Sequence, residues 1–174
     1  MIIRTALETD IAAIADIYEE IHTAEESGAG KTGWVRAVYP TRQTAEAALQ
    51  RGDLFVAEDG GTVAGAAIIN RQQVDVYHGA GWRFPAQDGE VMVLHTLVIS
   101  PKASGKGRGA EFVHFYEEYA RSQGCYVLRM DTNAINRRAR ALYQRLGYRE
   151  ADIVPCVFNG IEGVRLVLLE KRLD

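Results

Sequence analysis

The chain is poor in cysteine, and its two cysteines, Cys125 and Cys156, stand far apart. Neither lies in a CxxC or Cys/His pattern of the kind that binds zinc, so a disulfide framework and a metal site are not expected. No apolar run approaches the roughly 20 residues that cross a bilayer, and the first residues lack the basic, apolar and cleavage regions of a signal peptide. These absences predict a cytoplasmic protein with no membrane partner.

The sequence also lacks a strong excess of one charge. Its formal net charge is −3 at pH 7, whereas proteins that bind nucleic acid usually carry a strongly basic face. We therefore expect no nucleic-acid partner. A length of 174 residues suits one domain, 1–174, that buries about two thirds of its unfolded surface.

A glycine-rich turn past the midpoint is the most informative feature that is present. Gly105, Gly107 and Gly109 occupy alternate positions after an apolar strand ending near Ile99, and a helical pattern follows. Glycines let successive backbone amides point toward one centre, and a helix N-terminus adds free N–H groups and a positive dipole end. The segment is typical of a loop that cradles a phosphate, although a purely structural turn has the same composition.

Two known nucleotide-binding patterns compete for this loop. A P-loop is excluded because no Lys followed by Ser or Thr closes it. A dinucleotide fingerprint fits loosely on residues 105–110, with Asp131 near the end of the next strand, where a ribose-binding acid would lie. That fingerprint normally follows the first strand of its domain, so the position past the midpoint disfavours NAD binding without excluding it.

A second motif lies some thirty residues further on. The pattern Asn-x-x-Ala-x-x-Leu-Tyr-x-x-x-Gly-Tyr is formed by Asn136, Ala139, Leu142, Tyr143, Gly147 and Tyr148. Together the two segments resemble the acetyl-coenzyme A signature of the Gcn5-related N-acetyltransferases (GNAT). The family's phosphate loop, Gln/Arg-x-x-Gly-x-Gly/Ala, falls on residues 104–109, and Ser104 departs from the usual Gln or Arg. The resemblance covers residues 91–148 most closely.

This resemblance implies an α/β (α+β) fold, a mixed, mostly antiparallel sheet of about seven strands flanked by about four helices. Periodicity and turn residues predict strands at 2–5, 54–58, 62–70, 90–99, 126–131, 148–158 and 164–170. Helices are predicted from about residue 10 to a break at 27–33, at 41–50, at 105–123 and at 136–146. The resulting order, β-α-α-β-β-β-α-β-α-β-β, is the one that the resemblance implies.

Acetyl-CoA is the co-substrate that the resemblance implies. Amides of the loop would hold its pyrophosphate, with charge added by Lys106 or Arg108, and Asn136 would both cap the following helix and contact the coenzyme. Backbone groups of the preceding strand would hold pantetheine, and the amide of Leu97 or Val98 would polarise the acetyl carbonyl. The expected coenzyme contacts are Leu97, Val98, Ile99, Ser104, Gly105, Lys106, Gly107, Arg108, Gly109, Ala110, Asn136 and Tyr143.

Three residues are candidates for catalysis. Tyr143 occupies the family's general-acid position, where its phenol would protonate the departing sulfur, although an aromatic at this helical spacing could equally pack. His95 is the leading base, because alternation along a strand places it on the face of Leu97 and because the segment resembles that of arylalkylamine N-acetyltransferases. Glu90 is the second choice, acting through a water molecule.

The acceptor is expected to be a small-molecule primary amine, attacked directly in a ternary complex. Irregular segments supply the expected substrate contacts, which are Trp34, Tyr39, Asp75, Tyr77 and Trp82; packing of these loops onto the core is the competing role. An aromatic wall with an acid suits an amine that carries an apolar group. The alternatives are a peptide or protein N-acetyltransferase and a non-catalytic acyl-CoA sensor, and a homodimer is one option for the assembly.

Overall fold

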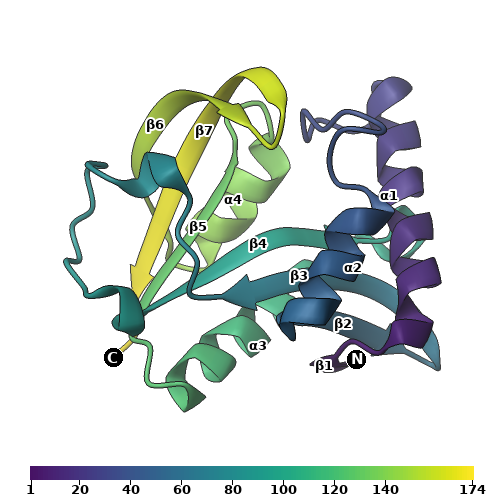
Figure 1. Cartoon of the computed structure of the whole chain (residues 1–174), viewed down its shortest axis with the longest axis horizontal. Coiled ribbons are helices and arrows are strands. Elements are labelled where there is room, and N and C mark those ends of the chain that lie inside the picture. The colour runs from purple at the N-terminus through teal and green to yellow at the C-terminus, as the bar shows by residue number, and fades with distance from the viewer.

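The computed structural model describes residues 1–174, and its strands form one seven-stranded sheet in the order β1-β2-β3-β4-β5-β7-β6 (Figure 1). Neighbouring strands are antiparallel except β4 and β5, which run parallel. The strands are β1 (Ile2–Thr5), β2 (Leu54–Asp59), β3 (Thr62–Asn70), β4 (Val91–Ile99), β5 (Val127–Asn133), β6 (Arg149–Phe158) and β7 (Ile161–Arg172). The predicted mixed, mostly antiparallel sheet is confirmed.

Four helices cover the two faces of the sheet (Figure 1). They are α1 (Ile11–Glu26), α2 (Arg42–Arg51), α3 (Arg108–Ser122) and α4 (Arg137–Arg145). Alternation along the strands separates two cores: Ala66 and Ile68 of β3 pack with α1 and α2, whereas Ala67 and Ile69 pack on the α3 and α4 face. None of these helices combines the length and the apolar character that a membrane crossing requires.

Residues 71–90, here called the strap, connect β3 to β4 and contain two short 3-10 helices, η2 (Asp75–Tyr77) and η3 (Asp88–Glu90). The strap packs on the side of β4, β5 and β7 that carries Val93 and Leu168. By strand alternation this is the same side of the sheet as α1 and α2. Helices α1 and α2 therefore cover one part of this face, and the strap covers another part.

Strands β4 and β5 separate partway along their length. Their parallel pairing runs from Val91 opposite Val127 to Leu94 opposite Met130 and then stops. Both strands continue, to Ile99 and to Asn133. The backbone of the last part of β4 consequently has no strand partner on its β5 side, and the sheet opens there.

A β-bulge interrupts β4 where the sheet opens. Between the pairs Ile68–His95 and Ala66–Val98, β4 contains one more residue than β3. Thr96 takes a left-handed φ of +51° within this segment, a conformation that a β-branched residue adopts only when its surroundings impose it. The Tyr39 hydroxyl hydrogen-bonds to the Thr96 hydroxyl, which ties the bulge to the segment between α1 and α2.

The bulge overturns one expectation from the sequence. Strict alternation would place His95 and Leu97 on the same face, but the extra residue shifts the alternation by one position. Leu97 packs against the core on the α3 and α4 face, whereas His95 contacts Asn70 on the opposite side. The prediction that the imidazole shares a face with the Leu97 side chain is therefore wrong.

Candidate active site

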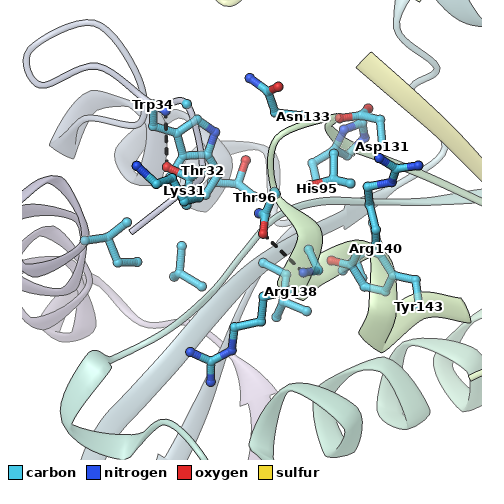
Figure 2. Close-up of a pocket in the computed structure, with 18 of the residues that line it drawn as sticks. Lys31, Thr32, Trp34, His95, Thr96, Asp131, Asn133, Arg138, Arg140 and Tyr143 are labelled. Carbon is cyan, nitrogen blue, oxygen red and sulfur yellow. Dashed lines mark hydrogen bonds between the residues drawn. The ribbon is translucent and has the colours of Figure 1, made fainter. Parts of the chain in front are cut away.

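A cleft of about 1710 Å³ passes between the separated ends of β4 and β5. Figure 2 shows side chains from both strands, from α4 and from the segment before α2 converging on it. The predicted coenzyme contacts that line the cleft are Leu97, Val98, Ile99, Ser104, Gly105, Gly107, Arg108, Gly109, Ala110, Asn136 and Tyr143. Of the predicted set, Lys106 is absent from the lining.

The glycine-rich loop enters α3 through two left-handed residues. Gly105 has a φ of +83° and Gly107, the N-cap, a φ of +76°, so the helix begins at Arg108 and not at Gly105 as the sequence indicated. Such φ values cost an L-residue about 1–2 kcal/mol. The glycines thereby expose the first N–H groups of α3 to the cleft, which is the geometry that anions favour.

The arginines near the loop and near the start of α4 differ in how far they are engaged elsewhere. Arg108 forms an ion pair with Asp59 at the end of β2, and this contact holds the pKa of Asp59 below its ordinary value. Arg140 pairs with Glu150 at 2.7 Å. Arg137 and Arg138 line the cleft and have no carboxylate partner within ion-pair distance. Arg137 and Arg138 therefore bring positive charge that no carboxylate neutralises to the cleft from the start of α4.

Asn136 has the predicted capping role. Its Oδ1 accepts a hydrogen bond of 3.1 Å from the Ala139 backbone N–H, which satisfies one of the free donors at the start of α4. Its side chain also lines the cleft. Opposite it, Gly109 allows α3 to approach α4 closely, because a Cβ at this position would lie 3.2 Å from Leu142 Cδ2.

Tyr143 projects from α4 into the cleft. Its side chain is buried and its ring packs edge-on against Tyr148, with centroids 6.1 Å apart. Burial, and after it the charge of Asp131, raises the pKa of the phenol above its ordinary value. The phenol is therefore protonated at neutral pH and retains a proton that it can donate at the cleft.

His95 lines the same cleft, next to the bulge. Asn70 Nδ2 donates to Asp53 at 2.8 Å, so its Oδ1 faces His95 Nε2 at 3.0 Å and the Nε2 atom carries the hydrogen. Desolvation lowers the pKa of the imidazole to about 4. The imidazole is therefore neutral at pH 7 and only weakly basic, through Nδ1.

The sequence predicts a role for Asp131 only as the ribose-binding acid of the dinucleotide pattern. In the structure it lies on β5 immediately after the last residue paired with β4, and it lines the cleft. Its Oδ2 accepts a hydrogen bond of 2.8 Å from the Tyr77 hydroxyl. Desolvation raises the pKa of the carboxyl to about 6. The sequence signal that could have identified Asp131 as a cleft residue was its position at the end of a predicted buried strand.

Two predicted substrate contacts stand together on the cleft wall. Trp34 and Tyr39 pack edge-to-face with centroids 6.1 Å apart, and Phe158 of β6 extends the row, 6.3 Å from Tyr39. All three line the cleft. Phe158 was not predicted, because β6 is remote in sequence from the other two residues.

Besides Lys106, four predicted catalytic and substrate residues lie outside the cleft lining. Glu90 is exposed at the opposite end of β4, where its carboxylate accepts from the Gln87 N–H at 2.9 Å. Asp75 is exposed on the strap. Tyr77 and Trp82 pack edge-to-face between the strap and the sheet, 5.2 Å apart. The strap folds back onto the sheet face, so its aromatic side chains turn inward and not toward the cleft.

Comparisons with known proteins agree with this geometry. Residues 12–148 match the family described as "Acetyltransferase (GNAT) family". The chain is 26% identical over 153 residues to an uncharacterized N-acetyltransferase of Bacillus subtilis, YhfO, a match that spans 86% of this chain and 91% of that protein.

Solved structures share the fold. An acetyltransferase of the GNAT family from Streptococcus agalactiae has a TM-score of 0.82 at 24% identity, covering 99% of this chain and 95% of that one. YncA of Salmonella typhimurium, solved with its cofactor acetyl-CoA, has a TM-score of 0.72 at 21% identity, covering 100% and 94%. The family match includes both the glycine-rich loop and the motif on α4, and the chain therefore belongs to the GNAT acetyltransferase family and is an N-acetyltransferase.

Proposed function

We propose that the protein transfers the acetyl group of acetyl-CoA to the primary amine of a small molecule that carries an aromatic or apolar group. The observation that carries the proposal is the single cleft through the separated strands, because it joins the phosphate loop, Tyr143 and the aromatic wall. A ternary complex, with direct attack of the amine, suits a passage that opens on both faces of the sheet.

The residues of the cleft fit acetyl-CoA, the co-substrate typical of this family. The left-handed glycines leave the amides at the start of α3 free for a pyrophosphate. Past Leu94, the β5 side of β4 offers unpaired backbone groups to pantetheine, an amide chain. Arg137 and Arg138 offer charge to a further phosphate. Acetyl-CoA supplies an activated thioester carbonyl to this arrangement.

Two groups of the protein would then act on the reacting atoms. The backbone N–H of Leu97 or Val98, next to the bulge, would donate to the carbonyl oxygen as negative charge develops on it. Tyr143, neutral because of its raised pKa, would protonate the sulfur as it leaves. Leu97 and Tyr143 both pack with the core on the α3 and α4 face of the sheet, so both groups would act from the same side of the cleft.

The acceptor would enter from the other face. Trp34 packs with the core under α1 and α2, and His95 and Asp131 lie on that same side of the sheet. An aromatic wall attracts an apolar substituent and, through its ring faces, an ammonium group. Coenzyme and amine would thus approach the bulge from opposite sides.

A coenzyme A release assay across a panel of amines tests the proposal. We expect turnover of 2-phenylethylamine and related arylalkyl amines, and slower turnover of ethanolamine, which lacks an apolar group. Preferential turnover of peptides with free N-termini would replace the small-molecule acceptor by a protein acceptor. Saturable binding of acetyl-CoA with no release for any amine or peptide would indicate a sensor and would contradict the proposal.

Replacing His95 by glutamine has a small expected effect. An imidazole with a pKa of about 4 is poorly matched to proton removal near neutral pH, because the best base has a pKa close to the working pH. We expect kcat/KM for 2-phenylethylamine to fall less than about tenfold, compared with the roughly 10²-fold or greater loss typical of a positioned base. A loss in the larger range would restore His95 as the proton acceptor.

A further inference from the structure

Asp131 is the one carboxylate that lines the cleft where β4 and β5 separate. The register of the parallel pair ends at Leu94 and Met130, and Asp131 is the next residue of β5. Its side chain lies on the acceptor face of the cleft, because its neighbour Met130 belongs to the core under α3 and α4. An amine that reaches the bulge from this face enters the cleft that the carboxylate lines.

The side chains that interact directly with Asp131 are neutral, and the cation on the same face of β5, Arg129, lies over the Trp82 ring at 4.3 Å. The titratable side chains that face Asp131 are Tyr77 of the strap, Tyr39 of the segment before α2, Tyr143 of α4 and Cys156 of β6, and His95 of β4 lines the same cleft. No lysine or arginine forms an ion pair with Asp131, in contrast to the paired Asp53 and Asp59. A desolvated carboxylate without a cationic partner is costly, which suggests that the partner arrives with a ligand.

Tyr77 of the strap anchors this carboxylate through a hydrogen bond. Its hydroxyl donates to Asp131 Oδ2 at 2.8 Å, and the residue itself is only 3% exposed. Tyr77 is fixed in turn by Trp82, whose Nε1 donates to the Tyr77 carbonyl at 2.8 Å and whose ring meets the Tyr77 ring edge-on. One carboxylate oxygen is thus anchored, and the other remains for the cleft.

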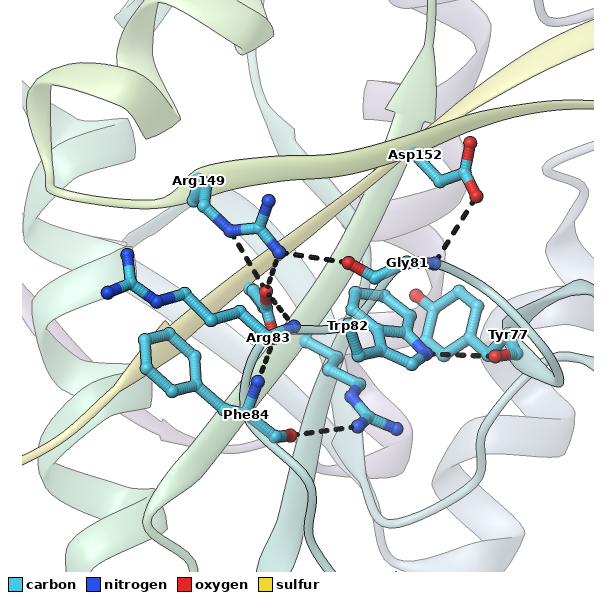
Figure 3. Close-up of polar contacts among 9 residues, drawn as sticks. Tyr77, Gly81, Trp82, Arg83, Phe84, Arg149 and Asp152 are labelled. Atoms are coloured by element: carbon cyan, nitrogen blue, oxygen red, sulfur yellow. Dashed lines mark hydrogen bonds and ion pairs between the residues drawn. The ribbon is translucent and has the colours of Figure 1, made fainter.

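The strap is fastened to the sheet at residues 81–84 (Figure 3). Glu170 of β7, fully buried, accepts from the backbone N–H groups of Arg83 and Phe84 at 2.8 and 3.2 Å. Arg149 of β6 binds both Glu170 and the Gly81 carbonyl. These contacts sit immediately beside Trp82, so the sheet fixes the position of Tyr77 and, through it, that of Asp131.

We propose that Asp131 is the group that binds the ammonium of the acceptor and removes its proton, and that Tyr77 and the strap position it. The inference rests on the proposed function. Asp131 takes one proton from the ammonium and passes it to solvent. The neutral nitrogen then forms the C–N bond while the C–S bond breaks, Tyr143 protonates the sulfur, and the second nitrogen proton restores the Tyr143 hydroxyl.

The direction of the pH dependence follows from the carboxyl. With a pKa raised by desolvation to about 6, Asp131 is ionised and able to accept a proton above pH 6, and it is protonated and inactive below that value. The Tyr77 hydrogen bond opposes this rise, because it stabilises the ionised form. Removing the Tyr77 hydroxyl therefore raises the pKa further.

The test combines carboxyl titration with pH–rate profiles. In wild type labelled with aspartate enriched in carbon-13 at Cγ, the resonance absent from Asp131→Asn is expected to titrate near pH 6, and in Tyr77→Phe at a higher pH. With 2-phenylethylamine and saturating acetyl-CoA, kcat/KM is expected to show an acidic limb near pH 6 in wild type. The limb moves to higher pH in Tyr77→Phe.

In Asp131→Asn, kcat/KM is expected to fall about 10²-fold at pH 7 and to rise continuously with pH as the free amine forms in solution, with no break near 6. Tyr148→Phe is the matched control. It also removes a buried hydroxyl that donates to a carboxylate, Glu117 at 3.1 Å, but Tyr148 lies outside the cleft lining. The acidic limb of its pH–rate profile is expected to stay near pH 6. Asp131→Asn is nearly isosteric and can still accept from Tyr77, which keeps the comparison available if Tyr77→Phe unfolds.

Several results would overturn the inference. An Asp131 carboxyl that titrates near its ordinary value of about 4, or an acidic limb that persists in Asp131→Asn, removes Asp131 as the acceptor. A limb that Tyr77→Phe leaves unmoved makes Tyr77 purely structural. Failure of wild type to acetylate 2-phenylethylamine counts against the proposed acceptor, and the carboxyl titration then decides the inference by itself.

Discussion

Gly107→Asp is expected to weaken acetyl-CoA binding about 10³-fold. The added carboxylate would stand at the N-cap of α3, among the amides that the loop offers to the pyrophosphate. Two negative charges about 4 Å apart repel by about 4 kcal/mol at an effective dielectric constant near 20, which corresponds to about 10³ in Kd. Calorimetric titration with acetyl-CoA measures the loss.

Gly124→Asp separates this effect from backbone strain. Gly124 has a φ of +73° and, like Gly107, leaves open space around the position that a Cβ would take, but it lies beyond the other end of α3 and outside the cleft lining. Its carboxylate would face the negative end of the helix dipole, so the control costs at least as much stability. Equal binding by wild type and folded Gly107→Asp would show that the loop does not hold the coenzyme.

Tyr143→Phe is expected to lower kcat about 10²-fold, the smaller end of the range for a positioned general acid. The ring and its edge-on contact with Tyr148 remain, so only the hydroxyl is lost. Affinity for acetyl-CoA is expected to change little. Rapid-quench measurement of the acetyl-transfer step, compared with calorimetry of coenzyme binding, separates the two quantities.

Tyr148→Phe again supplies the control. It removes a hydroxyl from the other member of the ring pair, one that donates to Glu117 and does not reach the cleft. We expect that variant to lose stability and to retain the transfer rate. An unchanged transfer step in Tyr143→Phe would mean that the phenol only packs, which was the alternative role at this helical position.

The parts of the site that depend on local chain geometry could be predicted from sequence. Left-handed glycines are required wherever a loop turns its amides inward, so Gly105 and Gly107 marked the phosphate loop. Asn136 marked the start of α4, because an N-cap needs a short polar acceptor. Both signals act within a few residues, and the GNAT family match covers the segment that contains them.

The parts of the site that depend on contacts between remote segments could not be predicted from sequence. The bulge at Thr96 is stabilised from the segment before α2, through Tyr39, and nothing in the β4 sequence marks it. The sequence predicts that Lys106 or Arg108 adds charge at the phosphate, but Asp59 pairs with Arg108 from the β2–β3 hairpin. Tyr77 was expected at the substrate, and the fastening of the strap to Glu170 instead turns it beneath Asp131.

Calorimetric titration of the wild-type protein with acetyl-CoA and, separately, with NAD distinguishes the two coenzymes that the glycine-rich loop could hold. The loop and the parted strands predict saturable binding of one acetyl-CoA per chain and no response to NAD. The dinucleotide pattern on residues 105–110, with Asp131 as its acid, predicts the reverse. Saturable NAD binding without any response to acetyl-CoA would rule out acetyl-CoA as the co-substrate.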